Sequence, residues 1–340
     1  MKQQLKDSVQ LTPDEERIVK RVKPYQTSYC PATEQARERE NDLMLVNEYA
    51  ADIFQYMREM EVILAPNVRH EEWMSTHIWQ MRWEVVNILT QYHEHLNMHL
   101  ETFFLAVNIF DRILSMLNHP SGEVSARKQM HERQCMIVRG FACLLIASKF
   151  EERNANVSLA LFVYELRKFG IPIEDEDFRK LERSFLRMID YNLGWPGPMS
   201  FLRRCTIADG SEIKARTLAK YILVAIQSHP QFLHYKPSLQ AAAALNLGRW
   251  IDGRMEWDES MQKFSGYGVE QVEVATLDMM NFLNYEGIED SFAYRVYSGK
   301  KKLCASPFVM KWIKQQALEQ HREQEQERRG YRQLLSFERT

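Results

Sequence analysis

The sequence has few cysteines, little net charge and no long apolar run. Its five cysteines form no CxxC pair and are odd in number, which argues against a disulfide framework and a zinc ribbon. No apolar run approaches the ~20 residues of a membrane-spanning helix, and the first ten residues lack the apolar core of a signal peptide. Forty-four basic and forty-six acidic side chains leave a net charge of −2, which does not favour nucleic acid or an anionic membrane. These absences predict a soluble intracellular chain with protein partners.

Strand-like alternation is also missing, whereas helical periodicity runs through most of the chain. At 340 residues, 45% of them hydrophobic, the chain can fill two ordinary cores. The run Ala241–Ala244 follows a helix rich in Leu, Ile and Val, as do the small residues of Ala142–Ala147 earlier in the chain. This correspondence predicts an all-α fold of two tandem five-helix repeats, with an extra N-terminal helix and a C-terminal helical extension. Helices are predicted over residues 46–61, 79–95, 101–117, 130–150, 159–169, 178–192, 199–208, 213–227, 237–252, 257–264 and 269–283.

Composition and breakers divide the chain into four parts. Residues 1–45 are rich in charge, contain three prolines and show little periodicity, so we expect a mobile leader. The glycines and prolines of Gly194–Pro198 mark the boundary between residues 46–193, the first repeat with its preceding helix, and residues 194–290, the second repeat. Residues 291–340 are predicted to form a helical tail that docks through Val309, Trp312 and Ile313 and then becomes a charged, solvated helix.

The segment from Phe103 to Glu152 carries the strongest functional signal. An apolar helix, FFLAVNIFDRILS, is followed by a second, VRGFACLLIASKFEE, whose small residues let another helix approach closely. The second helix ends in charge, with Phe150 placed between Lys149 and Glu151. A large aromatic residue beside a cation at a helix end is typical of a surface that binds another protein.

Three further motifs give these helices a family resemblance: MRWEVVN at Met81–Asn87, FLRRC at Phe201–Cys205 and YKPSLQAAAALNL at Tyr235–Leu247. With them the chain resembles the cyclins, nearest the mitotic A/B group, over residues 47–283. The resemblance implies a non-catalytic subunit that binds and activates a cyclin-dependent serine/threonine protein kinase in cell-cycle control. It also implies a heterodimer with that kinase, protein substrates, no cofactor, no contact with nucleic acid or membrane, and a location in the nucleus, the cytoplasm or both.

The same resemblance assigns a kinase-binding surface. In the family, the lysine of ASKFEE and a glutamate of the next long helix hold the main chain of the kinase near its movable helix. Lys149 and Glu182 match these positions, although their spacing alone is equally compatible with two unrelated surface charges. Taken singly, the apolar residues of this surface would more often be core than interface. The remaining members of the predicted surface are Phe150, Ile146, Arg183, Leu186, Tyr191 and Leu193, with Tyr49, Ile53 and Tyr56 from the preceding helix.

The sequence departs from the family in MRWEVVN. In the family, Met-Arg is followed by Ala-Ile-Leu-Val-Asp-Trp, an apolar patch that captures Arg-x-Leu peptides of substrates. The corresponding candidates here are Met81, Glu84, Val85, Ile88 and Ile137. A carboxylate in an apolar groove must stay solvated or weaken the binding of leucine, which puts peptide docking here in question.

Two structural features also follow from the resemblance. Arg82 and Asp111 are expected to form an internal pair that joins two helices. The loop from Met116 to Arg133 is about twelve residues longer than the relatives need and could carry a contact of its own.

Two functions of other classes have less support in the sequence. A general transcription factor of the B type uses the same duplicated fold, but it would need a basic face and usually a zinc ribbon. A metal-dependent hydrolase would need His93, His95 and His99, with Glu94 and Glu101, to bind a metal ion. Because no HExxH motif completes that set, we interpret it as a chance cluster and expect no metal site.

Overall fold

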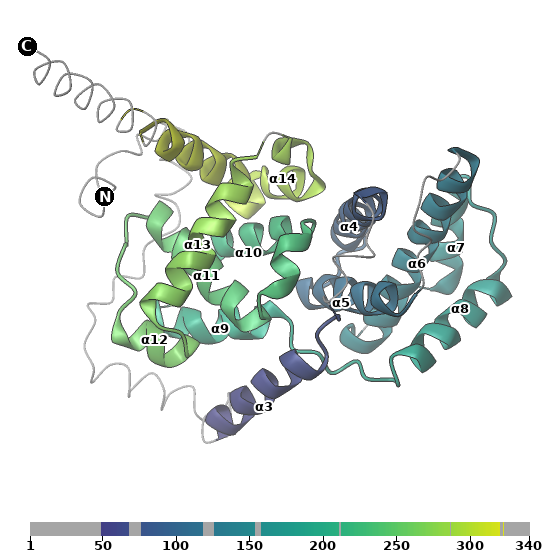
Figure 1. Cartoon of the computed structure of the whole chain (residues 1–340), viewed down its shortest axis with the longest axis horizontal. Coiled ribbons are helices and arrows are strands. Elements are labelled where there is room, and N and C mark those ends of the chain that lie inside the picture. Colours follow the sequence, from purple (N-terminus) through teal and green to yellow (C-terminus); the bar gives the residue numbers. More distant parts are fainter. Residues whose placement is uncertain are drawn as a thin grey trace, which may run out of the picture.

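The computed structural model describes residues 49–67, 76–117, 126–153, 158–210, 212–285, 287–319 and 322, and over these ranges it contains helices and no strand. The first repeat comprises α4 (Thr76–His95), α5 (Leu100–Met116), α6 (Ala126–Glu151), α7 (Leu159–Lys168) and α8 (Asp175–Met188). The second comprises α9 (Pro198–Ala208), α10 (Ile213–Ile226), α11 (Pro237–Ile251), α12 (Glu259–Ser265) and α13 (Val269–Leu283). Figure 1 shows the two repeats side by side, which confirms the predicted all-α duplicated fold.

Shorter elements surround the repeats. Helix α3 (Ala50–Ile63) precedes the first repeat and lies along the lower side of the molecule in Figure 1. The second repeat contains the 3₁₀ turn η3 (Pro230–His234) and is followed by η4 (Ile288–Asp290), α14 (Phe292–Tyr297), η5 (Lys300–Lys302) and a helix over 305–319. The predicted leader, residues 1–45, lies outside the described residues.

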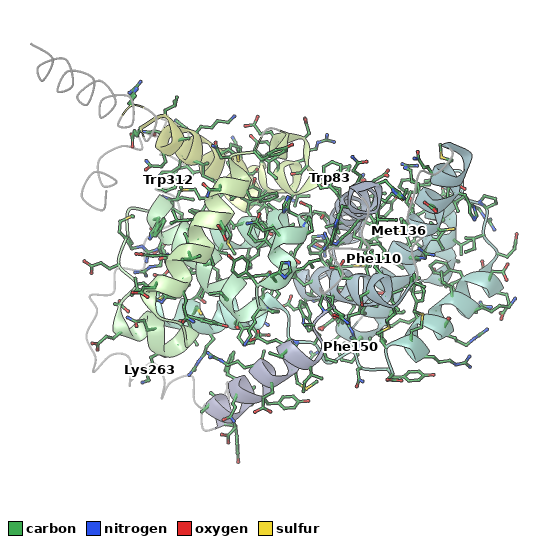
Figure 2. All side chains as sticks on the ribbon, in the orientation of Figure 1. Trp83, Phe110, Met136, Phe150, Lys263 and Trp312 are labelled. Atoms are coloured by element: carbon green, nitrogen blue, oxygen red, sulfur yellow. The ribbon has the colours of Figure 1, made fainter. Side chains whose placement is uncertain are left out.

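One buried helix forms the centre of each repeat. Every residue of α5 from Thr102 to Leu114 is buried, and so is nearly all of α11. Phe110, labelled in Figure 2, has no exposed surface within the first repeat, and neither does any of the alanines of Ala241–Ala244 in the second. Because alanines project little beyond the backbone, neighbouring helices can pack closely on α11.

Helix α6 begins earlier than its periodicity indicates. The prediction of a loop that runs from Met116 to Arg133 is wrong, because α6 is already helical from Ala126. Two contacts hold its first turns against α4: Arg133 donates to Glu84, and the His77 ring lies 3.2 Å from a Glu132 carboxylate oxygen. The side chains that stabilise these turns are therefore polar ones from a neighbouring helix, which leave no apolar period in the sequence.

The segment after the second repeat packs into the molecule. On α14, Ala293 and Tyr297 are buried, and the backbone N–H of Phe292 donates to Oδ1 of Asn87 on α4. In the helix over 305–319 the buried side chains include Val309 and Trp312, the latter labelled in Figure 2. Residues 291–319 thus belong to the packed structure, and the charged remainder of the predicted tail lies almost wholly outside the described residues.

Candidate functional site

Lys149 and Glu182 meet on the surface of the first repeat. Lys149 lies in the last turn of α6, where the helix dipole favours a cation, and Glu182 lies midway along α8. The Lys149 Nζ is 2.5 Å from a carboxylate oxygen of Glu182. The lysine side chain is 51% exposed and that of the glutamate 12%, so the ammonium group remains accessible from outside. The structure therefore brings together two residues that the sequence separates by 33 positions.

Phe150 is exposed beside this pair. Its side chain is 53% exposed, whereas Ala147 and Ser148 in the same turn of α6 have no exposed surface. Lys149 and Phe150 are the first exposed residues after this buried stretch of α6. Figure 2 labels Phe150 on the lower side of the first repeat. An exposed aromatic ring next to an accessible cation forms an apolar centre with a charged edge, the arrangement common to protein interfaces.

The C-terminal end of α8 adds two exposed side chains to this surface. Tyr191 is 64% exposed and has a positive φ of 56°, in the turn that ends the helix. Arg183 is exposed and donates to Glu176 at 2.8 Å. Leu186 and Leu193 are half-buried and pack against the core, so that each presents part of its side chain.

Helix α3 contributes the remaining members. Tyr49 beside its first residue, and Ile53 and Tyr56 within it, are all exposed, with Tyr56 at 61%. The opposite side of α3 packs inward: Phe54 lies 6.0 Å, centroid to centroid, from the ring of Phe201 in the second repeat. Among the residues that the structure describes, the aromatic and aliphatic stripe of Tyr49, Ile53 and Tyr56 is thus left without a partner on an otherwise anchored helix.

Ile146 is the exception among the predicted surface residues. Its side chain is 2% exposed and packs in the core of the first repeat. The expectation that it faces a partner is wrong for this structure, because Ile146 lies on the inward face of α6. Its apolar character could not distinguish core from interface.

The docking candidates do not form an open apolar patch. Met81, Val85, Ile88 and Ile137 are all buried in the core, so their assignment to an exposed groove is wrong for this structure. Glu84 is half-buried and accepts two hydrogen bonds from Arg133, one of them from Nε at 2.7 Å. The same hydrogen bonding raises the pKa of Arg133. Here α4 presents Trp83, which is 44% exposed, beside an occupied ion pair.

Arg82 and Asp111 form the expected internal pair. The guanidinium donates from Nε to Oδ1 at 2.6 Å and from Nη2 to Oδ2 at 2.8 Å, and neither side chain is accessible. Arg82 also donates from Nη1 to the carbonyl oxygens of Gln227 and Ser228, at 2.9 and 3.1 Å. These two contacts connect the first repeat to the end of α10 in the second. Sequence reasoning missed them because backbone carbonyls carry no residue signature.

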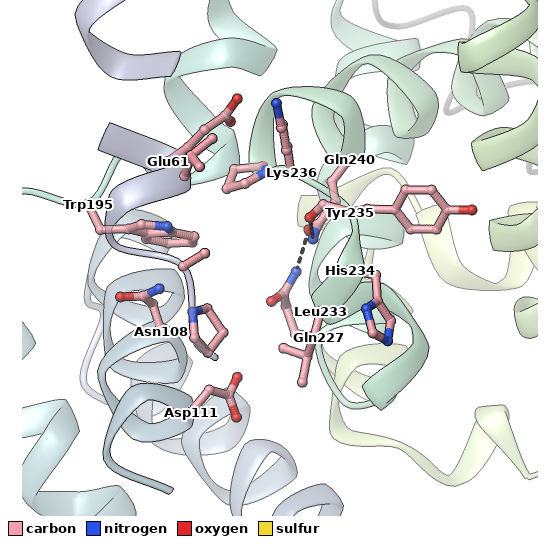
Figure 3. Close-up of a pocket in the computed structure, with 14 residues that line it drawn as sticks. Glu61, Asn108, Asp111, Trp195, Gln227, Leu233, His234, Tyr235, Lys236 and Gln240 are labelled. Atoms are coloured by element: carbon pink, nitrogen blue, oxygen red, sulfur yellow. Dashed lines mark hydrogen bonds between the residues drawn. The ribbon is translucent and has the colours of Figure 1, made fainter. Parts of the chain in front are cut away.

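A cavity of about 250 Å³ lies where the two repeats meet α3, and sequence reasoning did not find it. Figure 3 shows Asn108, Asp111 and Trp195 on one side and Gln227, Leu233 and Gln240 on the other. Its carboxylates, those of Glu61 and Asp111, already accept hydrogen bonds from Ser238 and Arg82. The full lining is Glu61, Val62, Ala65, Pro66, Asn108, Asp111, Trp195, Gln227, Leu233, His234, Tyr235, Lys236, Pro237 and Gln240.

The histidines near the end of α4 are dispersed. His93 is buried with Nδ1 3.0 Å from the carbonyl oxygen of Thr90, and burial lowers its pKa. His95 is exposed, and the His99 ring lies 3.6 Å from Glu152. Within the described ranges no group of three or more His, Cys, Asp or Glu side chains is placed to hold a metal ion. Over the same ranges, none of the helices combines the length and apolar character needed to cross a bilayer.

Comparison with known proteins identifies both repeats. A family model described as the N-terminal domain of cyclins matches residues 52–194, and one described as the C-terminal domain of cyclins matches residues 196–311. A viral cyclin from herpesvirus saimiri, of known structure, superposes with a TM-score of 0.50 at 16% identity, over 67% of this chain and 97% of its own. At that identity the likeness concerns the fold alone.

Two curated proteins are similar in sequence. The chain is 35% identical over 282 residues to the G2/mitotic-specific cyclin cdc13 of Schizosaccharomyces pombe, covering 82% of this chain and 54% of that protein. It is 33% identical over 275 residues to the G2/mitotic-specific cyclin-B of Emericella nidulans, with 81% and 54% covered. The chain therefore spans about half the length of the curated relatives that it matches.

Proposed function

This chain belongs to the cyclin family, and we propose that it is a regulatory subunit that binds a cyclin-dependent protein kinase and holds it in its active arrangement. The proposal extends to a serine/threonine kinase of the mitotic cell cycle, to protein substrates, and to action in the nucleus, the cytoplasm or both. It includes no contact with nucleic acid or membrane. The alternative, a general transcription factor of the B type, is not favoured, since both matching family models are those of cyclins.

One observation carries the proposal: Lys149 and Glu182 form an ion pair beside the exposed Phe150. The lysine ammonium has N–H groups left over to donate to main-chain carbonyl oxygens of a partner. The second carboxylate oxygen of Glu182 can accept from a main-chain N–H. Because the two side chains already restrain one another, little conformational entropy is lost when the partner binds.

A rigid surface of this kind can activate a kinase by selection. Protein kinases need a strand lysine paired with the glutamate of their movable helix before the phosphates and magnesium are correctly placed. A partner that prefers the inward helix by about 5.5 kcal/mol shifts that population from 1:99 to 99:1. One buried aromatic anchor and a few charge-assisted hydrogen bonds can supply such a preference. In this chain Phe150 would be the anchor, and Lys149 and Glu182 would supply the hydrogen bonds.

The double variant Lys149→Ala/Glu182→Ala tests the proposal. We expect it to remain folded, because the lysine of the pair is half-exposed and an ion pair at the surface contributes only about 0–1 kcal/mol. The cyclin concentration for half-maximal stimulation should rise about 1,000-fold, since truncating each of the two residues at the centre of the interface costs about 2 kcal/mol and 1.4 kcal/mol corresponds to tenfold. The measurement is phosphorylation by candidate cyclin-dependent kinases of the same organism as the cyclin concentration is raised.

The matched control is Asp177→Ala/Lys180→Ala. It removes an exposed ion pair of 2.9 Å from the same helix, α8, outside the predicted surface. This control should stimulate the kinase like the unaltered chain. Full stimulation by the Lys149→Ala/Glu182→Ala variant would refute the site, and failure of the unaltered chain to stimulate any of these kinases would refute the function.

A further inference from the structure

Helix α11 begins without a cap of its own. Its N-cap residue is Lys236, whose side chain makes no capping hydrogen bond, and Pro237 occupies the first helical position. The first N–H groups of a helix have no partner within it, and proline removes only one of them. The N–H of Ser238 needs an acceptor from elsewhere, because Ser238 is 1% exposed.

Glu61, from α3, supplies that acceptor. The backbone N–H of Ser238 donates to Oε2 of Glu61 at 2.9 Å, and the Ser238 hydroxyl donates to Oε1 at 2.7 Å. The residues are 177 positions apart, and each oxygen of the carboxylate is used. The positive end of the α11 dipole also favours a negative charge at this point. Figure 3 shows Glu61 on α3 beside the start of α11, marked by Lys236.

The position of Glu61 does not stabilise α3 itself. Glu61 lies in the C-terminal turn of α3, where the helix dipole disfavours an acidic side chain. It is 2% exposed, and burial raises its pKa even though the Ser238 hydrogen bonds act in the opposite direction. A buried carboxylate that costs free energy in this way can specify one geometry of packing.

Other hydrogen bonds of α3 act together with this one to fix its orientation. Arg58 donates to the carbonyl oxygen of Ser265 at 2.6 Å, and Asn108 donates to the carbonyl oxygen of Leu64 at 3.0 Å. At 3.6 residues per turn, Tyr49, Ile53 and Tyr56 stand about 80 to 140° around the helix axis from Glu61. A rotation of α3 that released Glu61 would therefore carry all three exposed side chains away from their present direction.

We propose that Glu61 is a positioning residue for kinase binding: it caps α11 from α3 and so sets the rotation of α3 that presents Tyr49, Ile53 and Tyr56. The inference rests on the proposed function, since it concerns the α3 part of the same surface. The capping contact itself joins α3 to the second repeat whether or not a kinase is present.

Hydrogen exchange tests the positioning role without the kinase. In Glu61→Ala, the Ser238 amide and the amides of α3 should exchange about fivefold faster, as expected for the loss of a helix cap of about 1 kcal/mol. Glu61→Gln keeps one acceptor oxygen, so its exchange rates should lie between those of the unaltered chain and those of Glu61→Ala. The matched control is Glu59→Gln, which alters an exposed residue of α3 whose carboxylate accepts a hydrogen bond from Gln55 of the same helix, at 3.4 Å. Unchanged exchange at Ser238 or in α3 in Glu61→Ala would overturn the proposal.

A kinase titration supplies the second readout. Glu61→Ala should raise the cyclin concentration for half-maximal stimulation about tenfold and leave the maximum at saturation unchanged, because bound kinase still selects the productive α3 orientation. A half-maximal concentration that equals that of Glu59→Gln would overturn the positioning role. If the unaltered chain stimulates no kinase, the proposed function fails, while the exchange measurement still decides whether Glu61 positions α3.

Discussion

At the residue scale, His93 shows how burial determines chemistry. Its ring is 2% exposed, lies 5.3 Å from the ring of Phe103 and is 3.0 Å from the carbonyl oxygen of Thr90. Glu94 and Glu152 favour the protonated ring and Lys302 opposes it, but burial outweighs them and lowers the pKa below the ordinary 6.5. His93 is therefore a neutral core residue. Its closeness in the sequence to His95 and His99 resembled a cluster of metal ligands, but the three side chains are dispersed in the structure.

This burial predicts a loss of stability in mild acid. The unfolded chain binds a proton at His93 below about pH 6.5 and the folded chain does not, so the free energy of unfolding should fall as pH drops from 7 towards 5. One such group contributes about 1.4 kcal/mol per pH unit between its folded and unfolded pKa values. Urea unfolding across this range measures the slope.

The variants His93→Gln and His95→Gln separate this contribution from others. His93→Gln should reduce the slope, although His229, whose pKa is also lowered by burial, will leave part of it. His95→Gln, which alters an exposed ring on the same helix, is the comparison variant. Equal slopes in the two variants would contradict the assignment of His93 as the neutral buried group.

At the scale of elements, α10 and α11 can approach closely at Gly248 because glycine has no side chain. A Cβ atom added at Gly248 would lie 2.6 Å from the backbone carbonyl oxygen of Ala215 on α10. Backbone atoms cannot yield as a flexible side chain can, so the two helices must separate to admit even a methyl group. The alanine run showed that α11 packs closely, but only the structure locates the closest approach.

Gly248→Ala should therefore destabilise the chain by about 1–3 kcal/mol, as overpacking does in cores. This outweighs the roughly 1 kcal/mol by which alanine is preferred to glycine within a helix. Gly299→Ala is the control, because its added Cβ meets no atom within 4 Å and its φ is not positive. It should stay within about 0.5 kcal/mol of the unaltered chain in urea unfolding. A Gly248→Ala chain as stable as this control would show that the helices separate at no cost.

At the scale of the whole molecule, the two repeats are joined by buried polar contacts. Arg82 binds Asp111 in its own repeat and two carbonyl oxygens at the end of α10. Glu61 links α3 to α11, and α14 packs on α4. Contacts of this kind are directional, so they fix the relative placement of the repeats more strictly than apolar packing alone.

Arg82→Met should cost about 3–5 kcal/mol, because it leaves the Asp111 carboxylate buried without a partner. Adding Asp111→Leu should recover part of that loss, since the uncompensated charge is then gone. Urea unfolding followed by hydrogen exchange in each repeat measures both effects. Faster exchange is expected in α10 as well as in α4, whereas a change confined to the first repeat would contradict the bridging role.

The parts of the fold that could be predicted are those whose signal lies within one continuous stretch of sequence. The bounds of α5, α7, α11 and α13 agree with periodicity within a residue or two, because a buried helical face repeats along the chain. The start of α6 was missed because its first turns are held by polar contacts with α4. Arg133 donates to Glu84, and Glu132 contacts His77. The assignment of Lys149 and Glu182 to one surface came from a family motif rather than from spacing, and their contact with each other came from the structure.

The sequence by itself determined the helices, their duplication and the family, because amphipathic periodicity, breakers and motif residues lie in contiguous stretches. Only the tertiary structure decided that Ile146 faces inward, that Arg82 reaches the second repeat and that Glu61 caps a helix 177 positions away. These outcomes depend on which faces meet once the chain has folded. Local side-chain identity does not reveal them, since the partners lie far apart in the sequence and several of them are backbone groups.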